Sequence, residues 1–238
     1  MSKPLYRRVM LKLSGEMLGG TKGGIDGVAI EAVALEVSRA KELGVEVAIV
    51  IGGGNIFRGS TAAHWGMDRT SADYMGMLAT IINGLALQAI LESKFNLQTR
   101  VMTAITMTEL AEPYIRRRAI KHLESGHIVI FAGGTGNPLF TTDTAASLRA
   151  REINADVIMK ATKVDGIYDS DPHKNPHAKK FSELTYLDVI SKKLDVMDAT
   201  AITMCMEAHM PIVVFKMGDP YCVADVINGK MSGTIVRS

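Results

Sequence analysis

Cysteine and aromatic residues are scarce in this chain of 238 residues. Aromatic residues make up 5% of it, and the two cysteines, Cys205 and Cys222, form no CxxC pair and have no second cluster of metal-ligating residues beside them. This pattern argues against a thiolate metal site and a disulfide framework, and we interpret both as free thiols in a reducing compartment. Ala, Val, Ile, Leu and fifteen Met must therefore fill most of the core.

An excess of charge of one sign is also absent. The formal net charge is +2, without the clustered basic excess typical of nucleic-acid-binding proteins, and the one dense basic run, at residues 116–118, fits a solvated helix face. No apolar stretch approaches the roughly 20 residues that a membrane span needs, and the first ten residues lack the apolar run of a signal peptide. We therefore expect no nucleic-acid or membrane partner and a cytoplasmic location.

Short apolar segments alternate with helical patterns along the chain. The predicted strands are residues 8–13, 45–51, 100–105, 127–132, 156–160, 211–215 and 233–236, and the predicted helices are residues 26–44, 71–92, 112–125, 143–153, 186–193, 199–208 and 220–227. In the helix at 71–92, Met75, Leu78, Ile82, Leu85 and Ile90 lie on or near one stripe. The alternation predicts an α/β fold with a mostly parallel sheet covered on both faces. With no linker and no repeat, residues 1–238 are expected to form a single domain.

Polar or glycine-rich loops follow four of the predicted strands. They lie at residues 14–15 (SG), 52–54 (GGG), 133–136 (GGTG) and 160–162 (KAT). In an open α/β sheet, ligands bind beyond the carboxyl ends of the strands, where glycine lets backbone N–H groups approach an anion. One such loop is often only a turn, but several in one small domain indicate a ligand with several phosphates.

The common nucleotide and hydrolase motifs are missing. GxxxxGK[ST] does not occur, which excludes a P-loop NTPase, and Phe57 and Leu139 stand where a dinucleotide fingerprint needs its third glycine. HExxH and GxSxG are absent too. His173 and His177 flank Pro176 in a predicted loop, where solvated side chains fit better than a metal site.

Lysines at strand ends supply the remaining chemistry. Lys12 and Lys160 each lie at the end of a buried strand beside one of these loops. A lysine is rarely central in a buried strand without a partner, and a ligand with several negative charges would be one. The alternative is that each lysine only extends from its strand end to solvent. Asp143 can cap the helix that follows Thr141 and Thr142, and it can equally hold both lysines by ion pairing.

Four segments, in the same order, resemble those of bacterial UMP kinases. They are residues 12–16 (KLSGE), 51–59 (IGGGNIFRG), 134–143 (GTGNPLFTTD) and 160–168 (KATKVDGIY), the last followed by Asp171-Pro172. The resemblance covers essentially the whole chain. The first two segments are shared across the amino acid kinase superfamily, whereas residues 134–143 and 73–77 (DYMGM) are more particular to the UMP-specific branch. The resemblance implies a three-layer αβα sandwich that transfers the γ-phosphoryl group of MgATP to UMP. Its N-terminal part would mainly bind UMP, and its C-terminal part mainly ATP.

The resemblance also implies roles for individual residues. The catalytic residues would be Lys12, Asp143, Lys160 and Asp198, with Asp143 orienting the lysines and Asp198 supporting them. ATP would be bound by Lys12, Leu13, Ser14, Gly15, Gly54, Arg58, Thr162, Tyr168 and Asp171, although the Tyr168 ring also fits an ordinary core position. UMP would be bound by Gly53, Arg58, Asp73, Thr135, Gly136, Asn137, Pro138, Leu139, Phe140, Thr141 and Thr142. Without a carboxylate cage, Mg²⁺ is expected to be carried by the ATP phosphates and water.

Regulation is implied by the same resemblance. Residues Gly20, Thr21, Lys22, Gly23, Gly24 and Ile25 align with a stretch where many relatives bind GTP as an activator. Gly24 replaces a bulkier residue of several relatives, so a plain loop-to-helix connection is the alternative. The family is typically hexameric, with the helix at 71–92 near subunit contacts, and UTP would inhibit.

Two other functions remain open on the sequence. A kinase of the same superfamily acting on a carboxylate such as glutamate, aspartate or acetylglutamate would share the lysines and glycine loops. A nucleotide-binding regulatory or storage protein would share the scaffold without turnover, although the presence of Lys12, Asp143 and Lys160 argues against an inactive site.

Overall fold

Nine strands form one sheet in the computed structural model, which describes residues 4–20, 23–218, 221–230 and 233–238. The strands are β1 (Arg8–Leu13), β2 (Glu46–Ile51), β3 (Thr99–Thr103), β4 (Glu112–Pro113), β5 (Ile128–Ala132), β6 (Val157–Thr162), β9 (Glu183–Thr185), β10 (Ile212–Lys216) and β11 (Thr234–Arg237). Their order is β4-β3-β5-β2-β1-β6-β10-β11-β9. The pairs are parallel, except that β10 and β11 run antiparallel. A separate antiparallel hairpin joins β7 (Ile167–Tyr168) to β8 (Lys180–Phe181).

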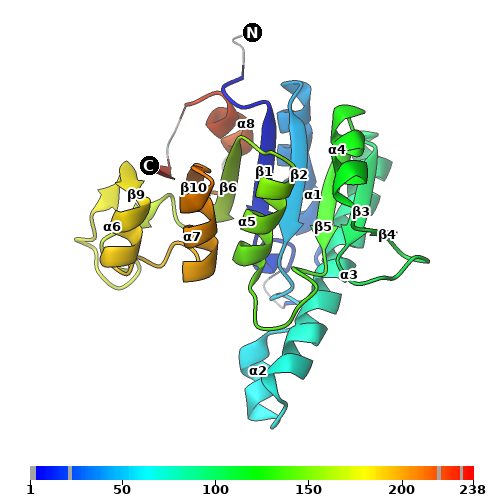
Figure 1. The fold of residues 1–238 in the computed structure, drawn as a ribbon, viewed down its shortest axis with the longest axis horizontal. Helices are drawn as coiled ribbons and strands as arrows, with labels where there is room; N and C mark the ends of the chain where they lie inside the picture. Colours follow the sequence, from blue (N-terminus) through cyan, green and yellow to red (C-terminus); the bar gives the residue numbers. More distant parts are fainter. Residues whose placement is uncertain (1–3, 21–22, 219–220, 231–232) are drawn as a thin grey trace.

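Helices cover both faces of the sheet (Figure 1). One face carries α1 (Gly27–Glu42), α3 (Arg69–Phe95) and α8 (Cys222–Ile227), and the other carries α4 (Arg116–Glu124), α5 (Thr142–Glu152), α6 (Tyr186–Ser191) and α7 (Ala199–Glu207). The short helices η1 (Gly15–Met17) and α2 (Gly59–His64) follow β1 and β2. The predicted α/β fold with a three-layer αβα arrangement is confirmed.

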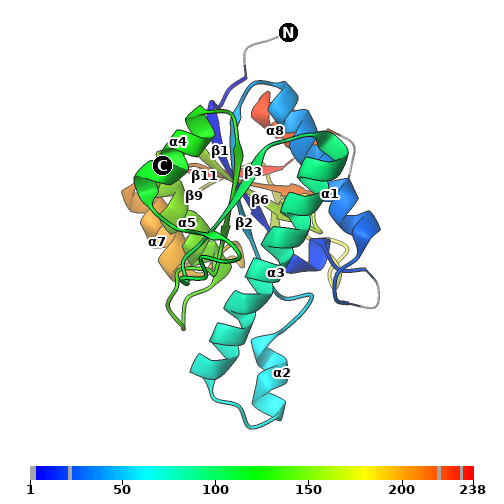
Figure 2. The ribbon, with the colours of Figure 1, turned by 90° about the vertical axis from the view of Figure 1, so that its right-hand side faces the viewer.

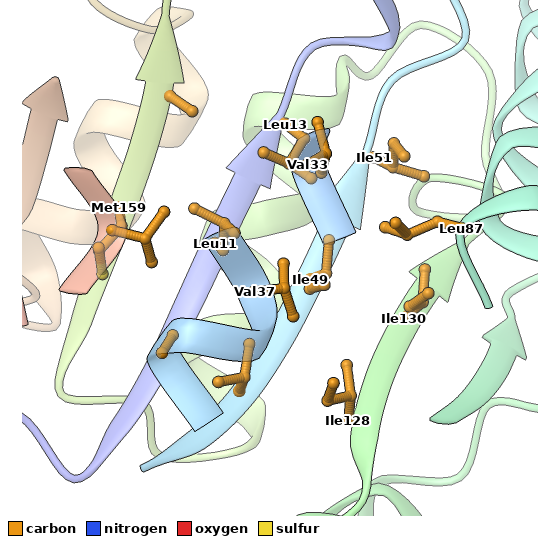
Figure 3. Packing of buried hydrophobic residues seen from close by; sticks show 14 of the residues in the cluster. Leu11, Leu13, Val33, Val37, Ile49, Ile51, Leu87, Ile128, Ile130 and Met159 are labelled. Carbon is orange, nitrogen blue, oxygen red and sulfur yellow. The ribbon is translucent and has the colours of Figure 1, made fainter. Parts of the chain in front are cut away.

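The period of two along β1 divides its side chains between the two layers. Leu11 and Leu13 pack with Val33 of α1 (Figure 3), whereas Met10 belongs to the core beneath α5. Because alternate residues of a strand point to opposite faces, Lys12 shares the α5 face with Met10. The side chain of Lys12 therefore points toward the helix layer that contains α5.

The helix α3 carries apolar side chains on both its packed and its exposed faces. It corrects the expectation that no apolar stretch approaches the length of a membrane span, because by length and composition alone it is long and apolar enough to cross one, and 44% of its most apolar window is buried inside the fold. The face packed against the core carries Met77, Ile81 and Leu87, whereas Leu78 and Ile82, which the sequence places on or near one stripe, are 44% and 46% exposed. The close approach of this helix is to the loop after β2, where a Cβ atom on Gly53 would lie 2.7 Å from the backbone oxygen of Gly76 and 2.8 Å from the Cβ of Ala79.

The helix predicted at residues 112–125 begins later than expected. Residues Glu112–Pro113 form β4, and α4 begins at Arg116. Proline disfavours helical backbone at the residue before it and lacks the N–H of a helix interior. In this position Pro113 suits a strand at the edge of the sheet.

Candidate active site

The carboxyl ends of β1, β2, β5 and β6 lie along one edge of the sheet. Since β1 pairs with β2 on one side and β6 on the other, the chain leaves β1 at a point where the strand order reverses. Ligands of open α/β sheets bind in the crevice at such a switch point. Three of the four loops singled out from the sequence follow β1, β2 and β5, whereas the fourth prediction is corrected, because residues 160–162 are the last residues of β6.

Lys12 and Lys160 lie opposite each other on neighbouring strands, in register between β1 and β6. Nζ of Lys12 lies 2.8 Å from Oδ1 of Asp143, and Nζ of Lys160 lies 2.9 Å from Oδ2 of the same carboxylate. Lys160 also donates to the backbone oxygen of Val196. Two cations share one anion, so the cluster keeps an excess positive charge at the switch point.

Burial and the neighbouring charges shift the pKa values of this cluster in opposite directions. Burial alone raises the pKa of Asp143, but the charges of Lys12 and Lys160 outweigh it, so the pKa lies below its ordinary value. For Lys160, burial lowers the pKa most, and the charge of Asp143 offsets only part of that effect. Asp143 is therefore ionised at neutral pH, and Lys160 releases its proton more readily than an exposed lysine.

The N-terminus of α5 positions Asp143. Thr141 is the cap of this helix, and its hydroxyl accepts from the backbone N–H groups of Asp143 and Thr144 at 3.1 and 3.3 Å. The suggestion that Asp143 caps the helix is therefore wrong, because both of its oxygens are taken by lysines. The alternative, ion pairing with both lysines, is what the structure contains.

Asp198 connects α7 to the same helix terminus. It caps α7 by accepting from the N–H of Ala201 at 3.0 Å, and its carboxylate also accepts from the hydroxyls of Thr141 and Thr144. Asp198 thus holds the segment that carries Asp143, and the lysine ammonium groups are bound by Asp143 itself.

A first cavity, of about 160 Å³, lies between α3 and the loop that precedes α5. It gathers five of the residues predicted to bind UMP, namely Gly53, Asp73, Phe140, Thr141 and Thr142. Asp73 accepts from the backbone N–H of Leu139 at 2.8 Å, which ties the loop to α3. Residues Thr135, Gly136, Asn137 and Pro138 lie in the same loop but outside the lining of the cavity. A Cβ atom on Gly136 would meet the backbone of Ala104 at 3.1 Å.

A second cavity, of about 490 Å³, shares Gly54 with the first and is also lined by Arg58, Glu16 and Lys163. Arg58 donates to the backbone oxygen of Gly54 at 3.1 Å and pairs with Glu16, and Lys163 contacts the other oxygen of Glu16 at 2.6 Å. The hydrogen bond from Lys163 is the main reason that the pKa of Glu16 lies below its ordinary value. Two cations thus converge on one carboxylate beside the loop after β2.

A third cavity, of about 390 Å³, lies between the β7–β8 hairpin and the segment after α6. Tyr168 and Asp171, both predicted to bind ATP, line it. The hydroxyl of Tyr168 donates to Asp165 at 2.6 Å, and that bond raises the pKa of Tyr168. Thr162 lies at the end of β6, where its hydroxyl donates to the backbone oxygen of Val164 at 2.5 Å.

The loop aligned with GTP-binding stretches lies beside the second cavity, whose lining includes Gly20 and Gly23. Both Gly23 and Gly24 have φ near +74°, a backbone that favours glycine. Thr21 and Lys22 lie outside the described residues. Across the part of the chain that the structure describes, no group of three or more His, Cys, Asp or Glu is placed to hold a metal ion.

The model of the amino acid kinase family matches residues 7–216 of the chain. The chain belongs to the amino acid kinase family.

Individual relatives of this amino acid kinase are named as uridylate or UMP kinases. The chain is 57% identical over 239 residues to the chloroplastic uridylate kinase PUMPKIN of Arabidopsis thaliana, covering 99% of this chain and 70% of the relative. The UMP kinase structure from Bacillus anthracis is 44% identical, with a TM-score of 0.95 and coverage of 98% and 96%. That from Ureaplasma parvum is 39% identical, with a TM-score of 0.93 and coverage of 98% and 99%. The predicted family and enzyme class are confirmed.

Three site residues of this amino acid kinase escaped the sequence analysis. Glu16 and Lys163 occur inside the quoted motifs, but their pairing joins loops 147 positions apart, and neither motif indicates it. The hydroxyl of Thr144 donates to Asp198. Thr144 lies three residues after Thr141, and residues at this spacing share one face of a helix. That spacing was the available signal.

Proposed function

We propose that this chain phosphorylates UMP to UDP with MgATP as the donor. The family and the names of its relatives support a nucleoside monophosphate kinase. The observation that carries the proposal is a pair of cavities that share Gly54, the first of which is lined by Thr142, the residue before Asp143 of the lysine cluster. Lys163 lines the second cavity, and the next residue, Val164, lines the third.

We assign one ligand group to each of the three cavities. The first, with Asp73 and the loop before α5, takes UMP, and Asp73 accepts from its ribose hydroxyls. The second, with Arg58 and Lys163, takes the phosphates of ATP, since both side chains suit phosphate oxygens. The third, with Tyr168 and Asp171, takes adenosine. Thr142, which lines the first cavity, directly precedes Asp143, so the acceptor lies beside the lysine cluster.

Positioning and charge neutralisation account for the reaction. The phosphate of UMP is already an anion near neutral pH, its second pKa being about 6, so its oxygen can attack without a strong base. Lys12 and Lys160 offset the negative charge that spreads over the transferring phosphoryl group. Asp143 fixes the direction of both ammonium groups, and in-line placement of donor and acceptor supplies the remaining acceleration.

Mg²⁺ fits this site as an ion carried by the ATP phosphates. The carboxylates nearest the phosphate cavity are engaged, Glu16 by Arg58 and Lys163 and Asp143 by the two lysines. Mg²⁺ keeps several waters and is usually held through substrate phosphates. When bound, it neutralises charge on the donor phosphates.

A coupled assay of ADP release tests the proposal. The purified protein with MgATP is given UMP, CMP, dTMP, glutamate, aspartate or acetylglutamate in separate reactions. We expect turnover of roughly 1–100 s⁻¹ with UMP and little with the others. Turnover with a carboxylate would keep the fold and overturn the substrate, and ATP binding without turnover would support a regulatory protein.

Regulation, assembly and location belong to the same proposal. GTP would activate through residues 20–25, UTP would inhibit by entering the acceptor cavity, and the exposed apolar side chains of α3 would lie near contacts in a hexamer in the cytoplasm. The N-terminal half of α3 extends from the body together with α2 (Figure 2). Assays with each nucleotide and light scattering of the purified protein test these points.

A further inference from the structure

Asn83 is a polar side chain in the core. It lies on the inner face of α3 and is 0% exposed. A buried amide is costly unless its donors and acceptor are satisfied. A leucine or an alanine would meet the packing needs of this helix face more simply, so the partners of Asn83 explain why an amide stands there.

The partners of Asn83 belong to the loop that follows β2. Its Nδ2 donates to the backbone oxygen of Gly52 and to Oδ1 of Asn55, both at 2.7 Å, and its Oδ1 accepts from Nδ2 of Asn55 at 3.1 Å. The two side chains therefore form a reciprocal amide pair. This pair fixes the first glycine of the GGG loop to the rigid helix α3.

Asn55 in turn contacts two other loops of the site. Its Nδ2 donates to the backbone oxygen of Gly24 at 2.7 Å, and its own backbone oxygen accepts from the N–H of Gly24 at 2.8 Å. A Cβ atom on Gly15, in the loop after β1, would lie 2.6 Å from Oδ1 of Asn55. The loop after β1, the loop before α1 and the GGG loop thus meet at Asn55.

We propose that Asn83 and Asn55 act as a pair of positioning residues for the phosphate-binding loops. Neither side chain needs to touch the reacting atoms. The pair holds the backbone of residues 52–54 against that of Gly15, so that the N–H groups of Gly53 and Gly54 stay arranged for phosphate oxygens before the ligands arrive, whereas the N–H of Gly52 donates to the backbone oxygen of Leu13 at 2.9 Å. The part of this inference that concerns UMP binding rests on the proposed function. The part that concerns ATP binding rests on membership of the amino acid kinase family.

The pair is tested with Asn83→Ala, Asn55→Ala and the double variant. Leu87→Val is the matched control, because Leu87 lies one turn further along α3 and packs only in the core. In each protein we would measure kcat, KM for UMP and ATP, the Tm, and the Kd for ATP by titration calorimetry. Loss of a buried hydrogen-bonded pair predicts a rise of about tenfold in both KM values and in the Kd for ATP, with kcat changed less than threefold.

A structural role alone would lower the Tm of the variants without changing any KM or the Kd for ATP, as we expect for Leu87→Val. If the two amides act as one unit, the double variant binds ATP as strongly as whichever single variant binds it more weakly. Multiplicative losses in the double variant, or ATP binding by Asn83→Ala equal to that of the control, would overturn the pair. The calorimetric arm needs no turnover, so a failure of the UMP assay leaves this test intact.

Discussion

Lys12 and Lys160 are register partners on adjacent parallel strands, and Asp143 binds one ammonium group with each of its oxygens, at 2.8 and 2.9 Å. Two like charges side by side at a strand end would repel each other. A single carboxylate from the first turn of α5 makes the arrangement stable while leaving one positive charge uncompensated. The cluster is therefore prepared for an additional anion, which the transferring phosphoryl group supplies.

Asp143→Asn is expected to lower kcat about a hundredfold, a size typical of losing one electrostatic element of an active site. The neutral amide no longer fixes the direction of both ammonium groups. The Tm should fall as well, because the variant leaves the mostly buried ammonium groups of Lys12 and Lys160, 11% and 16% exposed, without their shared carboxylate. Steady-state kinetics and thermal unfolding measure the two effects separately.

Asp188→Asn is the matched control for this variant, since it removes a carboxylate from the first turn of another helix, α6. It should leave kcat unchanged and lower the Tm slightly by weakening a capping box. Equal kcat values in Asp143→Asn and the wild type would remove Asp143 from the mechanism.

The pH profile should report the titration of Lys160. Burial lowers the pKa of this lysine, and Lys160 is useful only when protonated. As the pH rises, kcat should therefore fall at a pH below the ordinary lysine value of about 10.4. Asp143 raises the pKa of Lys160, so Asp143→Asn should move this fall to still lower pH.

Lys160→Arg provides the check on that assignment, because a guanidinium keeps its proton throughout the range. This variant should be slower at every pH and show no alkaline fall. An alkaline fall at the same pH in the variant and the wild type would assign the titration to another group.

Asp73→Asn should weaken UMP binding without affecting ATP. The carboxylate holds the N–H of Leu139, whose φ is +73°, so the loop before α5 depends on it. We expect KM for UMP to rise about tenfold, the size of one charge-assisted hydrogen bond. Arg69→Ala removes only the exposed partner of Asp73 on the same helix and should leave both KM values within twofold. A parallel rise in KM for ATP would contradict a role confined to the acceptor cavity.

The elements that carry the chemistry could be predicted because their signals are local. Lys12 stands in an apolar run that only a strand explains, and the glycines after β2 and β5 mark strand ends directly. The bounds of α1 also follow from short-range rules, because Asp26 caps its first turn and Gly44, with a φ of +76°, follows its end.

Other features depend on distant contacts that no local pattern records. Apolar side chains stand on both the packed and the exposed faces of α3, with Ile81 buried and the neighbouring Ile82 46% exposed, so its sequence gives no hint of which face packs. The amide pair of Asn83 and Asn55 joins residues 28 positions apart. The role of Asp143 was open between a cap and an ion pair, because only the fold places both lysines beside it.

Glu16→Gln tests whether the carboxylate of Glu16 competes with ATP for Arg58 and Lys163, the two cations that line the second cavity. Glu16 pairs with both Arg58 and Lys163, so ATP must compete with this carboxylate. Exposed ion pairs contribute about 0.2–1 kcal/mol each, and their removal should lower the Kd for ATP about two- to fivefold at low salt. The gain should shrink at high salt, since screening weakens exposed charges. Lys163→Ala, which removes a cation instead, should raise the Kd. Titration calorimetry at two salt concentrations measures both, and weaker ATP binding by Glu16→Gln would mean that Glu16 orients the cations rather than competing for them.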